Sequence, residues 1–298
     1  MKTKVILALA ISAILLSGCG TTRTVPIIGR KQNLIVSDAQ VLSLSNQEYQ
    51  AYMKTAKPSS NATNTAMVKR IGQRMANAVN NYLNTNGLAS EVDSYQWEFS
   101  LVQDQSVNAF CMPGGKIVVY EGILPVTRDE QSLAVVIGHE VAHAVAKHSA
   151  ERMSNSIKQQ YGTQILGSVL SNSGVSSGTQ QLGAIAIGLG TSLGSAAYSR
   201  KQEYEADRLG LIFTAMAGYD PRVAVSFWQR MAQQSSGSTP TLFSTHPNDE
   251  KRIKHIQECM SEALQYYKGT SASTSMSVTL GKQTSKKPMK TIHISSKK

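Results

Sequence analysis

The sequence of 298 residues predicts a mainly helical α+β fold with one small sheet. From residue 65, apolar side chains recur every three or four positions, which is typical of an amphipathic helix, and Gly87 ends the pattern. Residues 95–103 alternate between apolar and polar side chains instead, and residues 116–120 form an apolar, β-branched run. Because helical patterns outnumber extended ones, we expect two or three strands in a small sheet and no barrel.

The first 18 residues have the layout of a secretory signal peptide. Lys2 and Lys4 precede an apolar run at residues 5–16, which is too short for an ordinary transmembrane span. The run ends in Leu-Ser-Gly-Cys, which resembles the bacterial lipobox, a signal whose cysteine is acylated and becomes the mature N-terminus. We therefore expect a lipid anchor at Cys19. A plain signal peptide with a chance cysteine is the alternative.

The rest of the chain divides into three segments. Residues 19–62 are expected to hold a polar tether (20–33) and a short helix (45–57), and residues 63–268 to form the folded domain. Residues 269–298 are rich in Ser, Thr and Lys and show neither helical nor strand periodicity. We interpret them as a basic, disordered tail.

The formal net charge of +11 comes from the two ends of the chain. Eight of the 30 basic residues lie there, whereas all 19 acidic residues lie within residues 19–268, which leaves that part a net charge of only +3. No basic and aromatic pattern occurs in the folded part. The sequence therefore argues against a nucleic-acid partner.

Within the folded domain, a strand at residues 108–110 should precede a turn at 113–115. Thr127 and Glu130 have capping-box spacing and predict the start of a largely buried helix. Residues 161–197 are rich in Gly and Ser; we favour a helical hairpin near the cleft, with a membrane-dipping segment as the alternative. Three further helices are expected near residues 200–217, from 221, and from about 253 to 269.

The buried helix carries the pentad HEVAH at residues 139–143. His139 and His143 are four residues apart, so their imidazoles project from one face and can bind one Zn²⁺ together. Glu140 is then directed at a zinc-bound water, which it would activate as general base for attack on a carbonyl. The alternative is a buried helix whose histidines bond to the backbone, but burying these polar groups without a purpose is costly.

A catalytic zinc usually has three protein ligands and one open position. Glu203 and Asp207 are four residues apart on a later helix and share a face. We expect Glu203 to be the third ligand and Asp207 to accept the free N–H of a ligand histidine. The alternative is a solvated acidic helix face, which is the expectation for Glu205.

Together these motifs resemble the gluzincin metallopeptidase family that includes HtpX, the prenyl protease Ste and the mitochondrial Oma protease. The segments at 108–115, 199–200 and 244–253 also match its pattern, so the resemblance covers about residues 65–265. It implies a zincin-type domain with its small sheet beside the zinc-binding helix. Long transmembrane helices are missing, so the chain looks like the soluble lipoprotein branch of which the peptidase LoiP is an example.

The resemblance also implies roles for later residues. His246 is expected to stabilise the oxyanion, with a surface histidine as the alternative, and Arg252 either pairs with an acid near the site or lies on a solvated helix face. The strand near residue 109 should pair with an extended substrate. His148 follows His143 by five residues, about 140° around a helix, so it should not bind the same metal. His255 and His293 have no partner pattern.

Two cysteines remain besides Cys19. In an exported protein, Cys111 and Cys259 either form a disulfide or stay as two ordinary, half-buried thiols.

The expected protein is a zinc-dependent endopeptidase that cuts unfolded or misassembled envelope proteins and so serves protein quality control. We expect it in a bacterial cell envelope, lipid-anchored and facing the periplasm, with the outer membrane favoured over the inner one. Its partners would be protein or peptide substrates and envelope assembly machinery. Two other functions stay open: a chaperone or assembly factor that holds client chains without cutting them, and a lipoprotein whose tail binds nucleic acid or an anionic surface.

Overall fold

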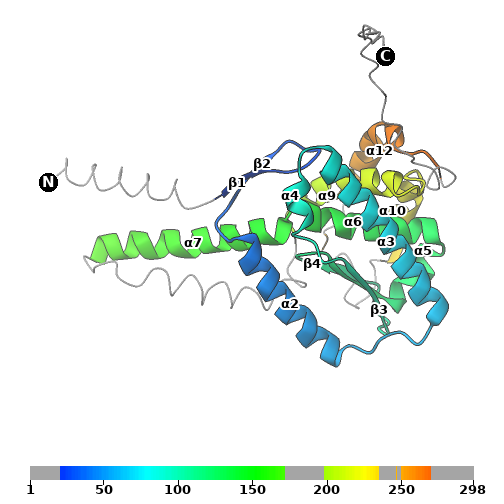
Figure 1. Ribbon diagram of the computed structural model, residues 1–298, viewed down its shortest axis with the longest axis horizontal. Helices are drawn as coiled ribbons and strands as arrows, with labels where there is room; N and C mark the ends of the chain where they lie inside the picture. Colours follow the sequence, from blue (N-terminus) through cyan, green and yellow to red (C-terminus); the bar gives the residue numbers. More distant parts are fainter. Residues whose placement is uncertain (1–20, 172–197, 235–245, 247–249, 270–298) are drawn as a thin grey trace, which may run out of the picture.

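The computed structural model describes residues 21–171, 198–234, 246 and 250–269. Helices dominate these residues, as the α+β prediction requires, and there are two small sheets where the sequence predicts one (Figure 1). The expected signal peptide, Cys19 and the expected tail from residue 270 lie outside the described residues.

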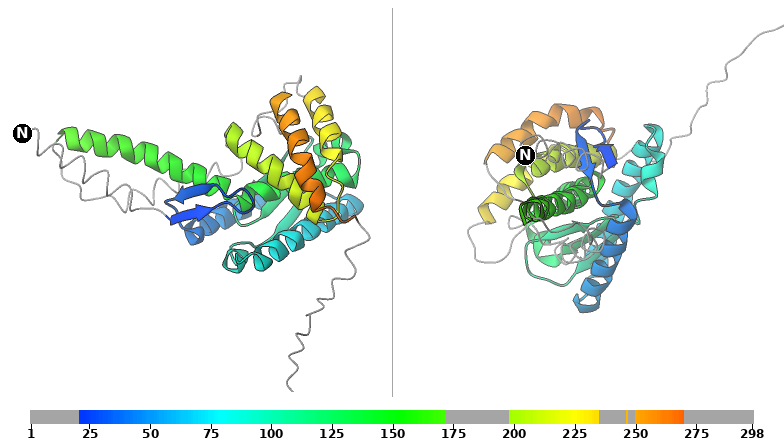
Figure 2. Two further views of the ribbon diagram at one scale, coloured as in Figure 1. Left: turned by 90° about the horizontal axis from the view of Figure 1, so that it is seen from above. Right: turned by 90° about the vertical axis from the view of Figure 1, so that its left-hand side faces the viewer.

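The helix that carries both motif histidines, α6 (Glu130–Val145), lies at the centre of the fold. A three-stranded sheet packs on one side of it and α9 (Arg200–Met216) on the other, and α12 (Glu250–Gln265) covers the outer side of α9 (Figure 2). Helices α3 (Ala62–Thr85) and α10 (Val223–Gln234) also pack against α6. Elements from across the chain therefore surround the motif helix.

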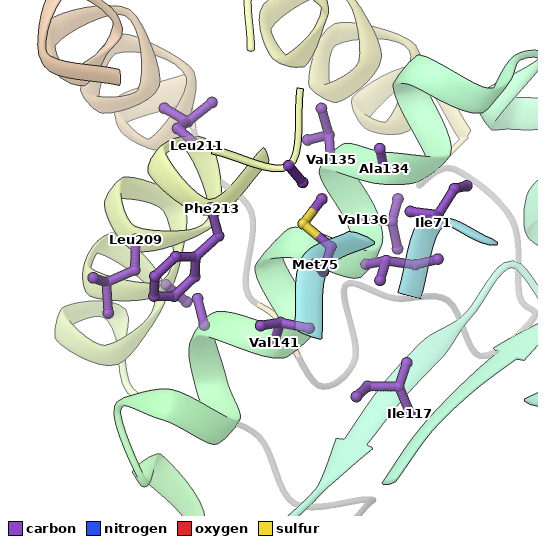
Figure 3. Packing of buried hydrophobic residues seen from close by; sticks show 14 of the residues in the cluster. Ile71, Met75, Ile117, Ala134, Val135, Val136, Val141, Leu209, Leu211 and Phe213 are labelled. Carbon is purple, nitrogen blue, oxygen red and sulfur yellow. The ribbon is translucent and has the colours of Figure 1, made fainter. Parts of the chain in front are cut away.

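The main hydrophobic core gathers around α6. Met75 of α3, Val136 and Val141 of α6 and Phe213 of α9 have at most 1% exposed surface, and Figure 3 shows them converging. Burying a large apolar side chain contributes about 1.5–3 kcal/mol relative to leaving it exposed. A helix buried on all sides can hold polar groups at fixed positions, since its neighbours leave it no room to rotate.

The sheet has the order β3–β5–β4, with β3 (Glu98–Val102), β4 (Ala109–Met112) and β5 (Lys116–Tyr120). β3 runs parallel to β5, and β4 pairs antiparallel with β5 through a tight turn. The outer edge of β3 is covered, because Ser59 N donates to Leu101 O at 3.0 Å. β4 forms the other edge and packs against α6.

The cap of α6 differs from the prediction. Asp129 is the N-cap, and its side chain accepts a hydrogen bond from Ser132 N at 2.7 Å. The Thr127 hydroxyl instead donates to Leu124 O at 3.0 Å and ends the short helix α5 (Leu124–Thr127). Asp and Thr are both good N-caps, so the sequence pattern placed the start of the helix correctly but chose the wrong residue.

The segment expected to be a polar tether is folded instead. β1 (Thr21–Thr24) pairs antiparallel with β2 (Lys31–Leu34), and Val25 between them is fully buried. We call residues 21–34 the N-terminal hairpin. The tether prediction was wrong because these polar side chains bind charged and carbonyl groups of the domain; Arg23, for example, donates to Val145 O at 2.9 Å.

The helix expected at residues 45–57 begins earlier. α2 (Asp38–Thr55) begins after Ser37, whose side chain forms a capping box with Gln40. The remaining short elements are α4 (Ala89–Val92) and η1 (Glu121–Ile123).

The first part of the expected hairpin at 161–197 belongs to one long helix. α7 (His148–Ser171) runs outward from the body of the molecule (Figure 1). The residues after 171 in that segment lie outside the described ranges. Among the described residues, no helix has both the length and the apolar character that a membrane span requires.

Candidate active site

Helix α6 carries three buried polar side chains in its C-terminal half. His139, Glu140 and His143 have at most 2% exposed surface, although the rest of the helix is almost entirely apolar. Buried polar groups need partners, because each unpaired one costs free energy. The partners of the two histidines come from α9, from α12, from His148 of α7 and from His246.

Helix α9 supplies two of the acidic partners. A capping box between Ser199 and Gln202 starts the helix, which places Glu203 in its first turn and Asp207 one turn later. Both carboxylates are buried. Helices α9 and α6 lie very close together here: a Cβ added to Gly210 of α9 would lie only 3.0 Å from the backbone of His139 of α6.

Four ligand atoms converge at this point, one each from His139, His143, Glu203 and His246, and all lie within 4.8 Å of one another. The Nε2 atoms of His139 and His143 are 3.1 Å apart, and each lies 3.4 Å from the Glu203 carboxylate. His246 Nδ1 lies 3.0 Å from Glu203 Oε1.

These four metal-ligand side chains, which we call the donor group, fit a divalent metal ion. Imidazole nitrogens and a carboxylate are ligands that zinc prefers, and a shared cation would explain why buried lone pairs point at one another. The first three residues are those that the sequence predicts as ligands. The structure adds His246, which the sequence analysis expected beside the substrate carbonyl, to the same group.

Glu140 lies beside the donor group without belonging to it. Its Oε1 is 3.4 Å from His246 Nε2, and neither carboxylate oxygen has a hydrogen-bond partner among the described residues. Burial raises the pKa of Glu140 to about 7, against the opposing effect of His246. A carboxylate with free lone pairs and a raised pKa is suited to accept a proton.

Asp207 and Arg252 form a buried pair behind His139. Asp207 Oδ1 lies 3.1 Å from His139 Nδ1, the arrangement expected for a carboxylate that orients a ligand histidine. Arg252 donates to both oxygens of Asp207 at 2.7 and 2.8 Å, and its Nη1 lies 3.0 Å from Glu203 Oε2. Burial would raise the pKa of Asp207, but Arg252 outweighs it and keeps that pKa low. Of the two alternatives for Arg252, the structure has the pairing with acids near the site.

His148 and Glu205 differ from their expected positions. His148 is fully buried, and its Nδ1 lies 2.9 Å from Nδ1 of His143. Its Nε2 lies 3.2 Å from Glu205, which is 8% exposed and therefore not on a solvated face. His148 is not among the four ligand residues, as expected, but its ring lies beside His143 because α6 ends before it: Lys147 has a φ of 51°, which breaks the helix. No sequence signal marks this turn.

The two cysteines are free and buried, so the disulfide alternative is wrong. Cys111 lies on β4 and Cys259 on α12, and α6 and α9 lie between these two layers (Figure 2). A disulfide needs Cα atoms within about 7 Å, which this layering prevents. His255, which had no partner pattern, contacts Cys259 at 3.6 Å and the Tyr204 carbonyl at 3.2 Å.

Comparison with known proteins identifies relatives of this arrangement. The model of Peptidase family M48 matches residues 62–260. Mitochondrial metalloendopeptidase OMA1 of Schizosaccharomyces pombe is 38% identical over 176 residues, which is 58% of this chain and 50% of the relative. Metalloendopeptidase OMA1, mitochondrial, of Bos taurus is 30% identical over 246 residues, 80% of this chain and 46% of the relative.

A bacterial protein is also similar. The beta-barrel assembly-enhancing protease of Escherichia coli K12 is 29% identical over 183 residues, 58% of this chain and 37% of the relative. The chain thus spans about half or less of the length of these curated relatives.

Proposed function

This chain belongs to Peptidase family M48 and carries a metalloendopeptidase domain, and we propose that it is a zinc-dependent endopeptidase that cleaves unfolded or misassembled envelope proteins. The observation that carries this proposal is the buried convergence of His139, His143 and Glu203 beside the carboxylate of Glu140, whose oxygens accept no hydrogen bond within the described residues. A purely structural cluster would pair Glu140 with a donor, because an unpaired buried carboxylate is costly.

The proposed ligands are His139, His143 and Glu203, with His246 adjoining them. When bound, zinc would supply Lewis acidity and would lower the pKa of the attacking water. Glu140 accepts the proton of the attacking water and passes it to the leaving amine. His246, whose Nε2 lies 3.4 Å from Glu140, donates to the oxyanion that develops on the scissile carbonyl.

Substrate binding is proposed at the open edge of the sheet. β4 packs against α6 and pairs with a strand on one side only, within the described residues. An extended peptide that adds to this edge would form main-chain hydrogen bonds that do not depend on its sequence. Such recognition suits a peptidase whose substrates are unfolded chains.

The envelope location is proposed from the sequence. The apolar run before Cys19 supports export and acylation, and with them a place in the LoiP-like lipoprotein branch, anchored to the outer membrane and facing the periplasm. The name of the Escherichia coli relative supports a link to envelope assembly machinery.

A single substitution tests the enzyme against the rival chaperone or assembly factor. Glu140→Gln keeps the shape of the side chain but removes the base, so purified protein should keep its zinc and lose about 10²- to 10⁴-fold in casein cleavage. Glu98→Gln, on β3 outside the donor group, is the matched control and should cleave normally. Full cleavage by the Glu140→Gln protein would contradict the proposed function.

The binding function of the tail is tested separately. Deleting residues 270–298 should leave casein cleavage and the cellular phenotype unchanged. A strong loss on deletion would favour the lipoprotein that binds through its basic tail.

A further inference from the structure

The helical conformation breaks between α6 and α7, and this break places His148 next to the donor group. Ala146 still has helical backbone angles, but Lys147 lies in the left-handed region with a φ of 51°. His148 then begins α7 with its ring against His143, the two Nδ1 atoms 2.9 Å apart. An uninterrupted helix would have carried the His148 ring about 140° away from His143.

The N-terminal hairpin holds this turn. The last carbonyl groups of a helix have no partner within the helix. Here Arg23 donates to Val145 O at 2.9 Å and Gln32 donates to Ala146 O at 2.7 Å. Both donors come from the hairpin, which precedes the segment that the family model matches. The hairpin therefore caps the end of the motif helix.

The far side of the His148 ring faces a carboxylate. Its Nε2 lies 3.2 Å from Glu205 Oε2, and Arg30 of the hairpin donates to both oxygens of Glu205, at 2.8 Å to Oε2. Arg30 also donates to Glu151, at 2.9 Å to Oε2. An ionised carboxylate only accepts hydrogen bonds, so His148 Nε2 must donate to Glu205.

The direction of this hydrogen bond determines which ring nitrogens of His148 and His143 carry a proton. A neutral imidazole has one donor and one acceptor nitrogen, so His148 Nδ1 accepts and His143 Nδ1 donates to it. His143 then keeps a free lone pair on Nε2, which lies 3.1 Å from Nε2 of His139 in the donor group. Asp207 has the corresponding role for His139, since its Oδ1 lies 3.1 Å from Nδ1 of His139.

We propose that His148 is a positioning residue that holds His143 in the tautomer and orientation needed for metal binding, through a relay anchored by Glu205 and Arg30. The proposal rests on the proposed function, since it takes His143 as a metal ligand. It makes the N-terminal hairpin part of the peptidase domain, because the hairpin supplies both the anchor of the relay and the cap of the turn.

The test measures zinc affinity of the purified full-length protein by competition with a chromophoric chelator. His148→Leu removes the acceptor and should weaken zinc binding about 10- to 100-fold. His148→Asn offers an oxygen near the position of Nδ1 and should restore most of that affinity. His255→Asn, on α12, changes a histidine outside the relay and should bind zinc like the unaltered protein. A folded His148→Leu protein with unchanged zinc affinity overturns the proposal.

Long-range ¹H–¹⁵N NMR provides a second readout that needs no substitution and no metal. In the metal-free protein, His143 should carry its proton on Nδ1 and His148 on Nε2. A proton on Nε2 of His143 overturns the relay, even where His148→Leu fails to fold. Unaltered protein that binds no zinc contradicts the proposed function instead, and the NMR result still decides the relay.

Discussion

Gly138 of α6 and Gly210 of α9 face each other where the two helices cross. A Cβ added to Gly138 would lie 2.9 Å from the carbonyl oxygen of Gly210, and a Cβ added to Gly210 would lie 3.0 Å from Cα of His139. The two backbones therefore touch at this crossing. This contact sets the distance from which Glu203 can reach the histidines of α6.

Gly210→Ala should separate the two helices and weaken both stability and the metal site. Overpacking a tight contact costs about 1–3 kcal/mol in the free energy of unfolding. We expect a lower unfolding temperature in thermal denaturation and reduced zinc retention on dialysis. Gly87→Ala is the control, since Gly87 has a φ of 74° but open space around it. It should be destabilised by its strained backbone alone and keep its zinc; equal zinc loss in both proteins would refute the role of the crossing.

Asp207→Asn should destabilise the fold and loosen His139. Arg252 is 1% exposed, and it would keep its charge while losing a charged partner. Breaking a buried ion pair in this way costs about 3–5 kcal/mol in urea-induced unfolding. Asp220→Asn, which breaks a largely exposed pair with Arg222, should cost at most about 1 kcal/mol. Similar losses for the two variants would contradict the structural role of Asp207.

His246→Ala should reduce turnover while zinc stays bound. Removing one oxyanion donor lowers kcat by about 10²- to 10³-fold. Steady-state peptide cleavage and metal analysis of the same preparation separate two roles, because His246 also lies in the donor group. Loss of zinc would show that His246 is a ligand, and faster cleavage would show that its ring obstructs the site; either result removes it from oxyanion binding.

Glu151 should make the free energy of unfolding depend on pH below about 4.5, the ordinary pKa of a glutamate. Burial would raise its pKa, but hydrogen bonds from Arg30 and Gln202 outweigh it, so the folded-state pKa lies below 4.5. A lowered folded-state pKa stabilises the protein above the unfolded-state value, and this contribution is lost as pH falls through the folded-state value. Glu151→Gln should therefore be less stable at pH 7, and the difference should shrink below pH 4.5.

Urea denaturation across this pH range measures the Glu151 effect. In an Arg30→Gln background, Glu151→Gln should lower the free energy of unfolding less at pH 7, because Glu151 has already lost its hydrogen bonds from Arg30. A difference between the Glu151 forms that stays constant from pH 7 to pH 4 would contradict this prediction.

Much of the site could be predicted because its residues lie on local patterns. The spacing of His139 and His143 fixes their common helix face, and the spacing of Glu203 and Asp207 fixes theirs. Local periodicity likewise located α3 and β5, since amphipathic repeats depend only on near neighbours.

Local residue spacing is enough to predict the chemical groups of this site: two imidazoles, two carboxylates and the helices that carry them. The contacts of His143 with His148 depend instead on long-range folding. The left-handed turn at Lys147 and the folding of the N-terminal hairpin onto α6 are long-range events, and no period in the sequence records them. Local patterns cannot predict such contacts, because the last carbonyl groups of a helix can accept hydrogen bonds from any donor close in space, however distant it is along the chain.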